Sequence, residues 1–215
     1  MIDVGDPVEV WSGLGFVLDG RLCRVGGIVF RLEAPGGGVT GWELAGAPDL
    51  LELPLADLGE GTTQPTGDRR QAGQRFDHPN GARALDHVVV ATPDLDRTIE
   101  AFEGAGVALR RTRKAGSPAE PLMQAFFKLG EVVVEVVGPP RPSAAGPASF
   151  YGLAFTVDDL DATAHLLGDR LRPARNAVQP GRRIATVDRT AGSSVPIAFM
   201  SPPPPREGAP SGVSG

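Results

Sequence analysis

Residues 85–102 read LDHVVVATPDLDRTIEAF, and a shift of 65 positions places this stretch over YGLAFTVDDLDATAHLL, residues 151–167. Each copy begins with a short apolar strand, 88–91 or 153–157, and continues into an acidic turn that is typical of a helix amino terminus. The matching positions are Asp94, Leu95, Asp96 and Thr98 in the first copy and Asp159, Leu160, Asp161 and Thr163 in the second. The pattern predicts an internal duplication.

Apolar residues follow at helical spacing in both copies, which predicts a helix with one buried face in each. Thr92 and Asp158 are the predicted N-caps. Three strand-like runs come after each helix, separated by Gly or Pro: 108–114, 122–129 and 131–137, then 171–178, 182–188 and 195–200. The sequence therefore predicts an α+β fold built from two tandem βαβββ units.

Two such units, with the opening motif LDHVVVATPDLD and the closing motif EVVVEVVGP, resemble the vicinal oxygen chelate superfamily. That superfamily contains glyoxalase I, extradiol dioxygenases, an acyl-CoA epimerase, fosfomycin-resistance enzymes and bleomycin-binding proteins. The resemblance covers residues 85–202, just over half of the chain. It implies that the two units join into a curved mixed sheet that forms a cup.

In the metal-using members, each unit supplies one ligand from its first strand and one from its last. The resemblance assigns these positions to His87 and Glu135 in the first unit, but to Gly152 and Ala198 in the second. Half of the expected set is therefore missing, and two protein ligands rarely hold a divalent ion. No cofactor is certain. Zn, Ni, Mn or Fe would need a third ligand, for which the candidates are Gln124, Tyr151 and His78.

Two other interpretations of His87 and Glu135 stay open. They are relics or hydrogen-bonding groups in a cup that binds an organic ligand, or they form a metal-free acid/base pair, because imidazole titrates near neutral pH and a carboxylate can orient it.

Strand alternation predicts which residues share the cup face with His87 and Glu135. The second unit contributes small side chains at Gly152 and Ala198, so the cavity should be mostly apolar and suit a bulky apolar or aromatic guest. The predicted ligand-binding residues are Gln124, Phe126, Gly152, Arg182, Arg183, Ala198 and Met200. Arg182 and Arg183 alternate, so at most one of them should face the cup and bind a carboxylate or phosphate.

The composition limits the kinds of partner and the cellular location that the protein can have. A formal net charge of -5 argues against nucleic-acid and anionic-membrane partners. Nineteen of the 21 basic residues are arginines, a skew that fits a GC-rich coding sequence, whereas an anion site would require particular arginines to converge. One cysteine, Cys23, and an acidic amino-terminal stretch favour a cytoplasmic location.

Four segments are predicted along the chain: a degenerate βαβββ-like unit at 1–58, a linker at 59–83, the glyoxalase-like domain at 84–202 and a disordered tail at 203–215. VGGIVFRLEAP, from Val25, aligns with the closing motif, and Arg31 then falls on Glu135. The alignment predicts that the amino-terminal unit lacks its opening strand, and a permuted strand at Val39 is the candidate for it. A single unpaired unit would expose a sheet edge or an apolar face, so we expect the main domain or a homodimer partner to cover it. Trp11 and Trp42 are the expected anchors of that packing.

The leading hypothesis is a glyoxalase-like protein that binds a small organic molecule in its cup. The alternatives are a divalent-metal-dependent lyase, isomerase or dioxygenase of the glyoxalase type, and a non-catalytic protein that sequesters a drug. Fold resemblance alone does not decide whether the protein is an enzyme.

Overall fold

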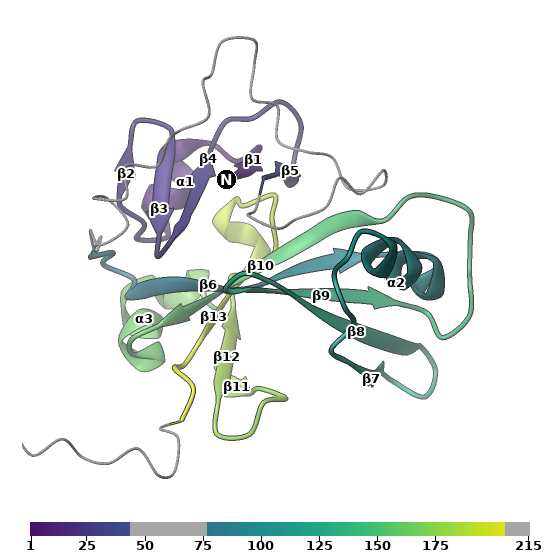
Figure 1. Cartoon of the computed structure of the whole chain (residues 1–215). Helices are drawn as coiled ribbons and strands as arrows, with labels where there is room; N and C mark the ends of the chain where they lie inside the picture. Colours follow the sequence, from purple (N-terminus) through teal and green to yellow (C-terminus); the bar gives the residue numbers. More distant parts are fainter. Residues whose placement is uncertain (44–76, 205–215) are drawn as a thin grey trace, which may run out of the picture.

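The computed structural model describes residues 1–43 and 77–204, and its largest feature is an eight-stranded sheet in the order β11-β12-β13-β10-β6-β9-β8-β7 (Figure 1). The strands are β6 (Ala82–Ala91), β7 (Arg111–Gly116), β8 (Pro121–Leu129), β9 (Val132–Gly138), β10 (Ser149–Val157), β11 (Arg175–Asn176), β12 (Arg183–Thr186) and β13 (Ile197–Met200). The first and last strands of each unit pair in parallel, β6 with β9 and β10 with β13, and β6 pairs antiparallel with β10. The two tandem βαβββ units are confirmed.

Two helices follow the opening strands, α2 (Leu95–Gly104) and α3 (Leu160–Leu167). Their N-caps are Asp94 and Asp159, whose carboxylates accept hydrogen bonds from backbone amides of the first turn. The predicted caps at Thr92 and Asp158 are wrong by two positions and one. The Thr92 hydroxyl instead bonds Thr98, 2.8 Å away, and the Asp158 carboxylate pairs with Arg83.

Strand β11 is much shorter than the predicted run 171–178. Pro173 and Pro180 flank it, and proline cannot donate a backbone hydrogen bond to a sheet. Leu171 keeps only an isolated bridge to Val187. Short 3₁₀ turns at Gly168–Arg170 and Arg189–Ala191 complete the second unit.

The amino-terminal residues form a second, five-stranded sheet in the order β2-β3-β4-β1-β5. Its elements are β1 (Ile2–Val4), α1 (Val8–Gly13), β2 (Leu18–Asp19), β3 (Leu22–Val25), β4 (Ile28–Arg31) and β5 (Val39–Trp42). Because β1 pairs in parallel with β4, this is the same βαβββ topology as in the two main units. The expectation that the opening strand is missing is wrong: Ile2–Val4 supplies it, and β5 lies antiparallel beside it.

The amino-terminal unit packs against the convex face of the main sheet, beside α3, and leaves the concave face open (Figure 1). Phe155 of β10 is the centre of this contact, with ring centroids 5.1 Å from Phe16, 5.4 Å from Phe30 and 6.0 Å from Trp11. Trp11 and Trp42 are both fully buried, as expected of core anchors. The main domain therefore covers the apolar face of this unit.

Residues 77–81 connect the two parts through buried polar contacts. His78 accepts a hydrogen bond from the Val17 amide and contacts the Arg24 carbonyl, while the Asn80 amide donates to the Leu14 carbonyl. Strand β6 begins at Ala82, inside the segment 59–83 predicted as a linker. The rest of that segment, residues 44–58 and most of the predicted tail lie outside the described residues. None of the described helices is long and apolar enough to cross a membrane.

Candidate functional site

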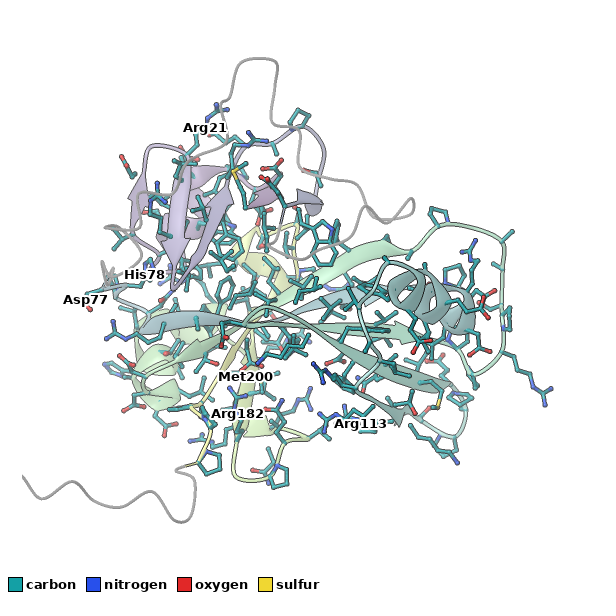
Figure 2. The ribbon with its side chains drawn as sticks, in the orientation of Figure 1. Arg21, Asp77, His78, Arg113, Arg182 and Met200 are labelled. Carbon is teal, nitrogen blue, oxygen red and sulfur yellow. The ribbon has the colours of Figure 1, made fainter. Side chains whose placement is uncertain are left out.

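The concave face of the main sheet encloses two adjoining cavities. The larger, about 640 Å³, lies against the β6–β10 seam, and its walls come from both units. The smaller, about 170 Å³, lies toward the outer strands β7 and β11. His87, Glu135 and Arg175 line both cavities, so the two form one continuous cup. Figure 2 shows Arg113 and Met200 on the side of the main sheet away from the amino-terminal unit, and we call the end of the cup at the smaller cavity its mouth.

A β-bulge in β6 places two consecutive polar side chains on the cup side. Ala154 pairs with His87 but the next residue, Phe155, pairs with Leu85, so Asp86 is the extra residue. Leu85 and Val88 both face the buried convex side, and Asp86 and His87 between them both turn toward the cup. Sequence reasoning missed Asp86, because simple alternation places it on the opposite face from His87.

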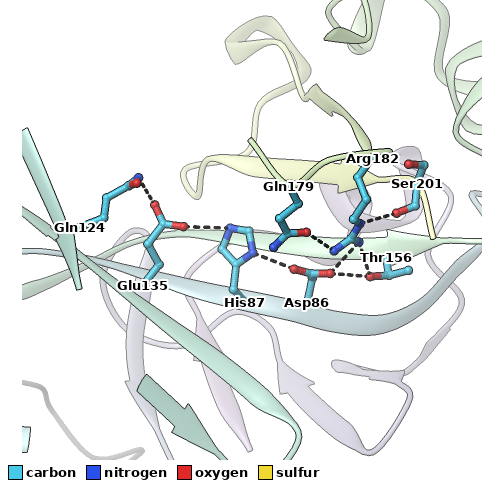
Figure 3. Close-up of polar contacts among 8 residues, drawn as sticks. All are labelled: Asp86, His87, Gln124, Glu135, Thr156, Gln179, Arg182 and Ser201. Atoms are coloured by element: carbon cyan, nitrogen blue, oxygen red, sulfur yellow. Dashed lines mark hydrogen bonds and ion pairs between the residues drawn. The ribbon is translucent and has the colours of Figure 1, made fainter. Parts of the chain in front are cut away.

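Asp86 orients the imidazole of His87. The distance from His87 Nδ1 to Asp86 Oδ1 is 2.9 Å (Figure 3). Because Asp86 is an acceptor, neutral His87 carries its proton on Nδ1 and leaves Nε2 free of hydrogen. Nε2 points to Glu135 Oε2, 3.8 Å away, on the wall of the cup.

Asp86 also anchors the second unit. Its Oδ2 lies 2.7 Å from a terminal nitrogen of Arg182 and accepts a hydrogen bond of 2.8 Å from the Thr156 hydroxyl. Burial alone would raise the pKa of Asp86, but the hydrogen bonds from His87, Arg182 and Thr156 outweigh it and hold that pKa well below its usual range. Asp86 is therefore a permanent carboxylate that links His87 to Arg182.

Glu135 is held from its other side by Gln124, whose amide nitrogen donates to Oε1 (Figure 3). The Gln124 carbonyl oxygen accepts a hydrogen bond of 2.8 Å from Arg113. The Gln124 amide thus lies between the Arg113 guanidinium and the Glu135 carboxylate, and its carbonyl oxygen is already bonded to Arg113.

Gly152 and Ala198 occupy the positions in the second unit that correspond to His87 and Glu135. Gly152 pairs with Val89 on β6 and Ala198 with Ala154 on β10, as the repeat requires, and both line the larger cavity. A Cβ atom added at Gly152 would lie 2.7 Å from the Pro196 carbonyl oxygen. A side chain at position 152 would therefore meet the Pro196 carbonyl, directly before β13, so its Cβ would occupy space that the backbone already holds.

The described residues do not fit the divalent metal that the family resemblance implies. They contain no group of three or more His, Cys, Asp or Glu side chains placed to hold an ion. Of the candidate third ligands, His78 uses both ring nitrogens in the contact with the amino-terminal unit, and Gln124 presents its amide N–H to Glu135. Tyr151 lines the larger cavity but is 55% exposed. The donor set consists of one imidazole nitrogen and one carboxylate oxygen, which is too few.

Phe126 and Met200 line the smaller cavity together with Gln124, in agreement with the predicted strand faces. The two adjacent arginines differ from expectation. Arg182 is only 7% exposed and turns inward, but Asp86, Thr156, Gln179 and the Ser201 carbonyl occupy its guanidinium. Arg183 points away and pairs with Asp161, 2.8 Å distant. Neither arginine lines the two cavities of the cup, because Arg182 is bonded within the buried network and Arg183 within a surface ion pair.

Three other arginines converge at the cup, and sequence reasoning did not single them out. Arg111 and Arg113 are two residues apart on β7 and so share one face of that strand, and Arg175 lies on β11 at the opposite edge of the sheet. All three line the smaller cavity. Strand alternation could have predicted that Arg111 and Arg113 lie on the same face. It could not have predicted that Arg175 lies near them, because that depends on the curvature of the sheet.

These observations define the class: a paired βαβββ domain whose curved sheet encloses a mainly apolar cup with one polar wall. Residues 86–186 match the family model described as the Glyoxalase/Bleomycin resistance protein/Dioxygenase superfamily. This part of the chain is a domain of that superfamily, which confirms the resemblance drawn from the repeat.

Solved structures with related folds include methylmalonyl-CoA epimerase from Mycobacterium tuberculosis, which is 24% identical over 58% of this chain and 91% of its own, with a TM-score of 0.46. A variant of Streptomyces coelicolor methylmalonyl-CoA epimerase in complex with 2-nitronate-propionyl-CoA is 21% identical over 56% of this chain and 97% of its own, with a TM-score of 0.44. No curated protein matches the chain.

Proposed function

We propose that the protein binds a small organic molecule in the cup without a metal ion. The observation that carries this proposal is the cavity of about 640 Å³, whose walls are mainly apolar and whose charged or titratable groups include His87, Glu135 and Arg175. Cavities of roughly 300–1,000 Å³ with a few convergent polar groups are typical of small-molecule sites. We place the protein in the cytoplasm, and this function requires neither a monomer nor a homodimer.

A neutral fluorescent probe, N-phenyl-1-naphthylamine, tests whether the cup is an open apolar site. We expect saturable fluorescence enhancement and a higher melting temperature in chelator-treated protein, because a ligand that binds only the folded state stabilises it. Ala198→Leu should weaken probe binding about tenfold or more, since the added methylenes fill the cavity. Ala162→Leu, on the exposed face of α3, is the matched control.

Metal analysis supplies the complementary test. Protein purified without chelators should contain far less than one equivalent of Zn, Ni, Mn or Fe. Stoichiometric metal that disappears in both His87→Ala and Glu135→Ala would overturn the metal-free site.

A second candidate function is metal-free proton transfer, which the Asp86–His87 pair favours. With Nδ1 bonded to Asp86, His87 Nε2 can accept a proton from a guest, and Glu135 Oε2 lies 3.8 Å away on the same wall. The corresponding positions on the opposite wall are Gly152 and Ala198, which carry no titratable group. The geometry therefore suits removal and return of a proton on one face of a substrate.

Exchange of carbon-bound hydrogen with D₂O, followed by NMR for 2-oxobutyrate and acetoacetate, tests this candidate. Exchange above the uncatalysed rate should survive EDTA and be lost in His87→Gln. His165→Gln changes an exposed histidine of α3 and should have no effect. Exchange that is absent from the wild type, or that persists in His87→Gln, rules out His87 as the base for these substrates.

A further inference from the structure

Two of the three arginines at the mouth of the cup, Arg111 and Arg113, are oriented by neighbouring groups on the cup face. The guanidinium carbons of Arg111 and Arg113 lie 4.5 Å and 5.5 Å from the centre of the Phe126 ring. Arg113 also donates to Gln124. An aromatic face attracts a guanidinium group and orients it, while its N–H groups at the edge stay available to bind an acceptor.

Arg175 faces this pair from the other unit. Strands β7 and β11 are the outer strands of the two units and lie at opposite ends of the sheet order, and the curvature brings them to one cavity of about 170 Å³. Among the described residues, no carboxylate forms an ion pair with Arg111, Arg113 or Arg175. This differs from Arg182, whose charge Asp86 balances.

The charges around the smaller cavity do not cancel. Its lining contains three guanidinium groups and one carboxylate, Glu135, which is turned toward Gln124 and His87. The whole chain carries a net charge of -5, so this positive mouth is a local feature. Cationic clefts with low-dielectric walls concentrate anions.

We infer that the guest of the cup is an amphipathic organic anion. Its oxyanion group, a carboxylate, phosphate or sulfonate, binds Arg111, Arg113 and Arg175, and its apolar body fills the larger cavity beside Gly152 and Ala198. This inference rests on the proposed small-molecule function and specifies the chemistry of the ligand.

A matched pair of fluorescent probes tests the inference. 8-Anilinonaphthalene-1-sulfonate is N-phenyl-1-naphthylamine with one added sulfonate, so the two differ in charge and share the same apolar body. In an Arg111→Gln/Arg113→Gln variant, which changes two arginines that line the smaller cavity and not the larger one, the dissociation constant of the anionic probe should rise about tenfold or more, while that of the neutral probe should change less than about twofold. Added salt should weaken only the anionic probe. Competition by phenylacetate and phenyl phosphate, against phenylacetamide, then distinguishes a carboxylate from a phosphate preference.

The control is Arg110→Gln/Arg141→Gln, which makes the same change in net charge at two exposed arginines outside the cavity lining. It should leave both dissociation constants within about twofold. If the dissociation constant of the anionic probe changes equally in both double variants, or in neither, the proposed arginine site is wrong. The cup would still bind the neutral probe in that case. If the neutral probe fails to bind the wild type, the proposed function itself fails.

Discussion

At the scale of single residues, Asp86 has the largest structural role in the site. It is a partly buried carboxylate that accepts hydrogen bonds from its neighbour His87 on β6, from Thr156 on β10 and from Arg182, directly before β12. Position 87 was identified from the sequence, but position 86 could not be, because a β-bulge depends on how β6 registers with β10. The same limit applies to Gly152, whose lack of room depends on the approach of Pro196.

Asp86→Asn should destabilise the fold by about 3 kcal/mol, since it leaves the buried Arg182 charge unpaired. Urea unfolding measures this effect, and Asp161→Asn, which breaks the exposed pair with Arg183, is the control and should have a much smaller effect.

The pH dependence of stability gives a second readout for Asp86. Its folded-state pKa lies below the ordinary value of 3.8. The folded state therefore binds fewer protons than the unfolded state in this range, and the contribution is complete above about pH 5 and is lost as the pH falls below about 4. Asp86→Asn should flatten the acid limb of the stability curve. An acid limb as steep as that of the wild type would contradict this assignment.

Gly152→Ala should lower the melting temperature, because the new methyl group meets the Pro196 carbonyl and forces β13 away from β10. We expect a loss of about 1–3 kcal/mol. Gly104→Ala, where nothing lies within 4 Å of the added methyl, is the control and should not destabilise. A neutral effect at Gly152 would mean that β13 moves freely and that position 152 can accept a side chain.

At the scale of elements, the sequence predicted the longer strands and both main helices, because their apolar periods are strong. The predicted length of strand β11 was too great, because Pro173 and Pro180 limit the strand to two residues. Strand β1 was missed because three residues, Ile2–Val4, carry no period, and it is recognised only by its parallel pairing with β4. The convergence of β7 and β11 likewise depends on sheet curvature, which no local pattern encodes.

The contact between α1 and the second unit depends on one buried side chain, Asp6. Its carboxylate accepts hydrogen bonds from the Trp11 indole at 3.1 Å, from the Ser193 hydroxyl at 2.6 Å and from the Ser194 amide at 2.7 Å. Asp6→Ala should cost about 2–3 kcal/mol, because these donors lose a charged acceptor. Asp19→Ala, at an exposed position of β2, should change the unfolding free energy by less than about 0.5 kcal/mol.

At the scale of the whole molecule, the amino-terminal unit and the main domain share one hydrophobic core. Both tryptophans, Trp11 and Trp42, lie in the amino-terminal unit, whereas the two longer helices, α2 and α3, lie in the main domain. Tryptophan fluorescence thus reports on the amino-terminal unit and its contact with the main domain, whereas far-UV circular dichroism reports on all the secondary structure, most of which lies in the main domain. We expect their urea transitions to coincide, and separated midpoints would show that the two parts unfold independently.

The inequality of the two halves of the cup has a stereochemical consequence. A guest would meet three unlike surfaces: the arginines at the mouth, the polar wall of His87 and Glu135, and the apolar wall of Gly152 and Ala198. Three different contacts in a fixed arrangement distinguish an object from its mirror image. This cup should therefore bind one enantiomer of a chiral amphipathic acid in preference to the other.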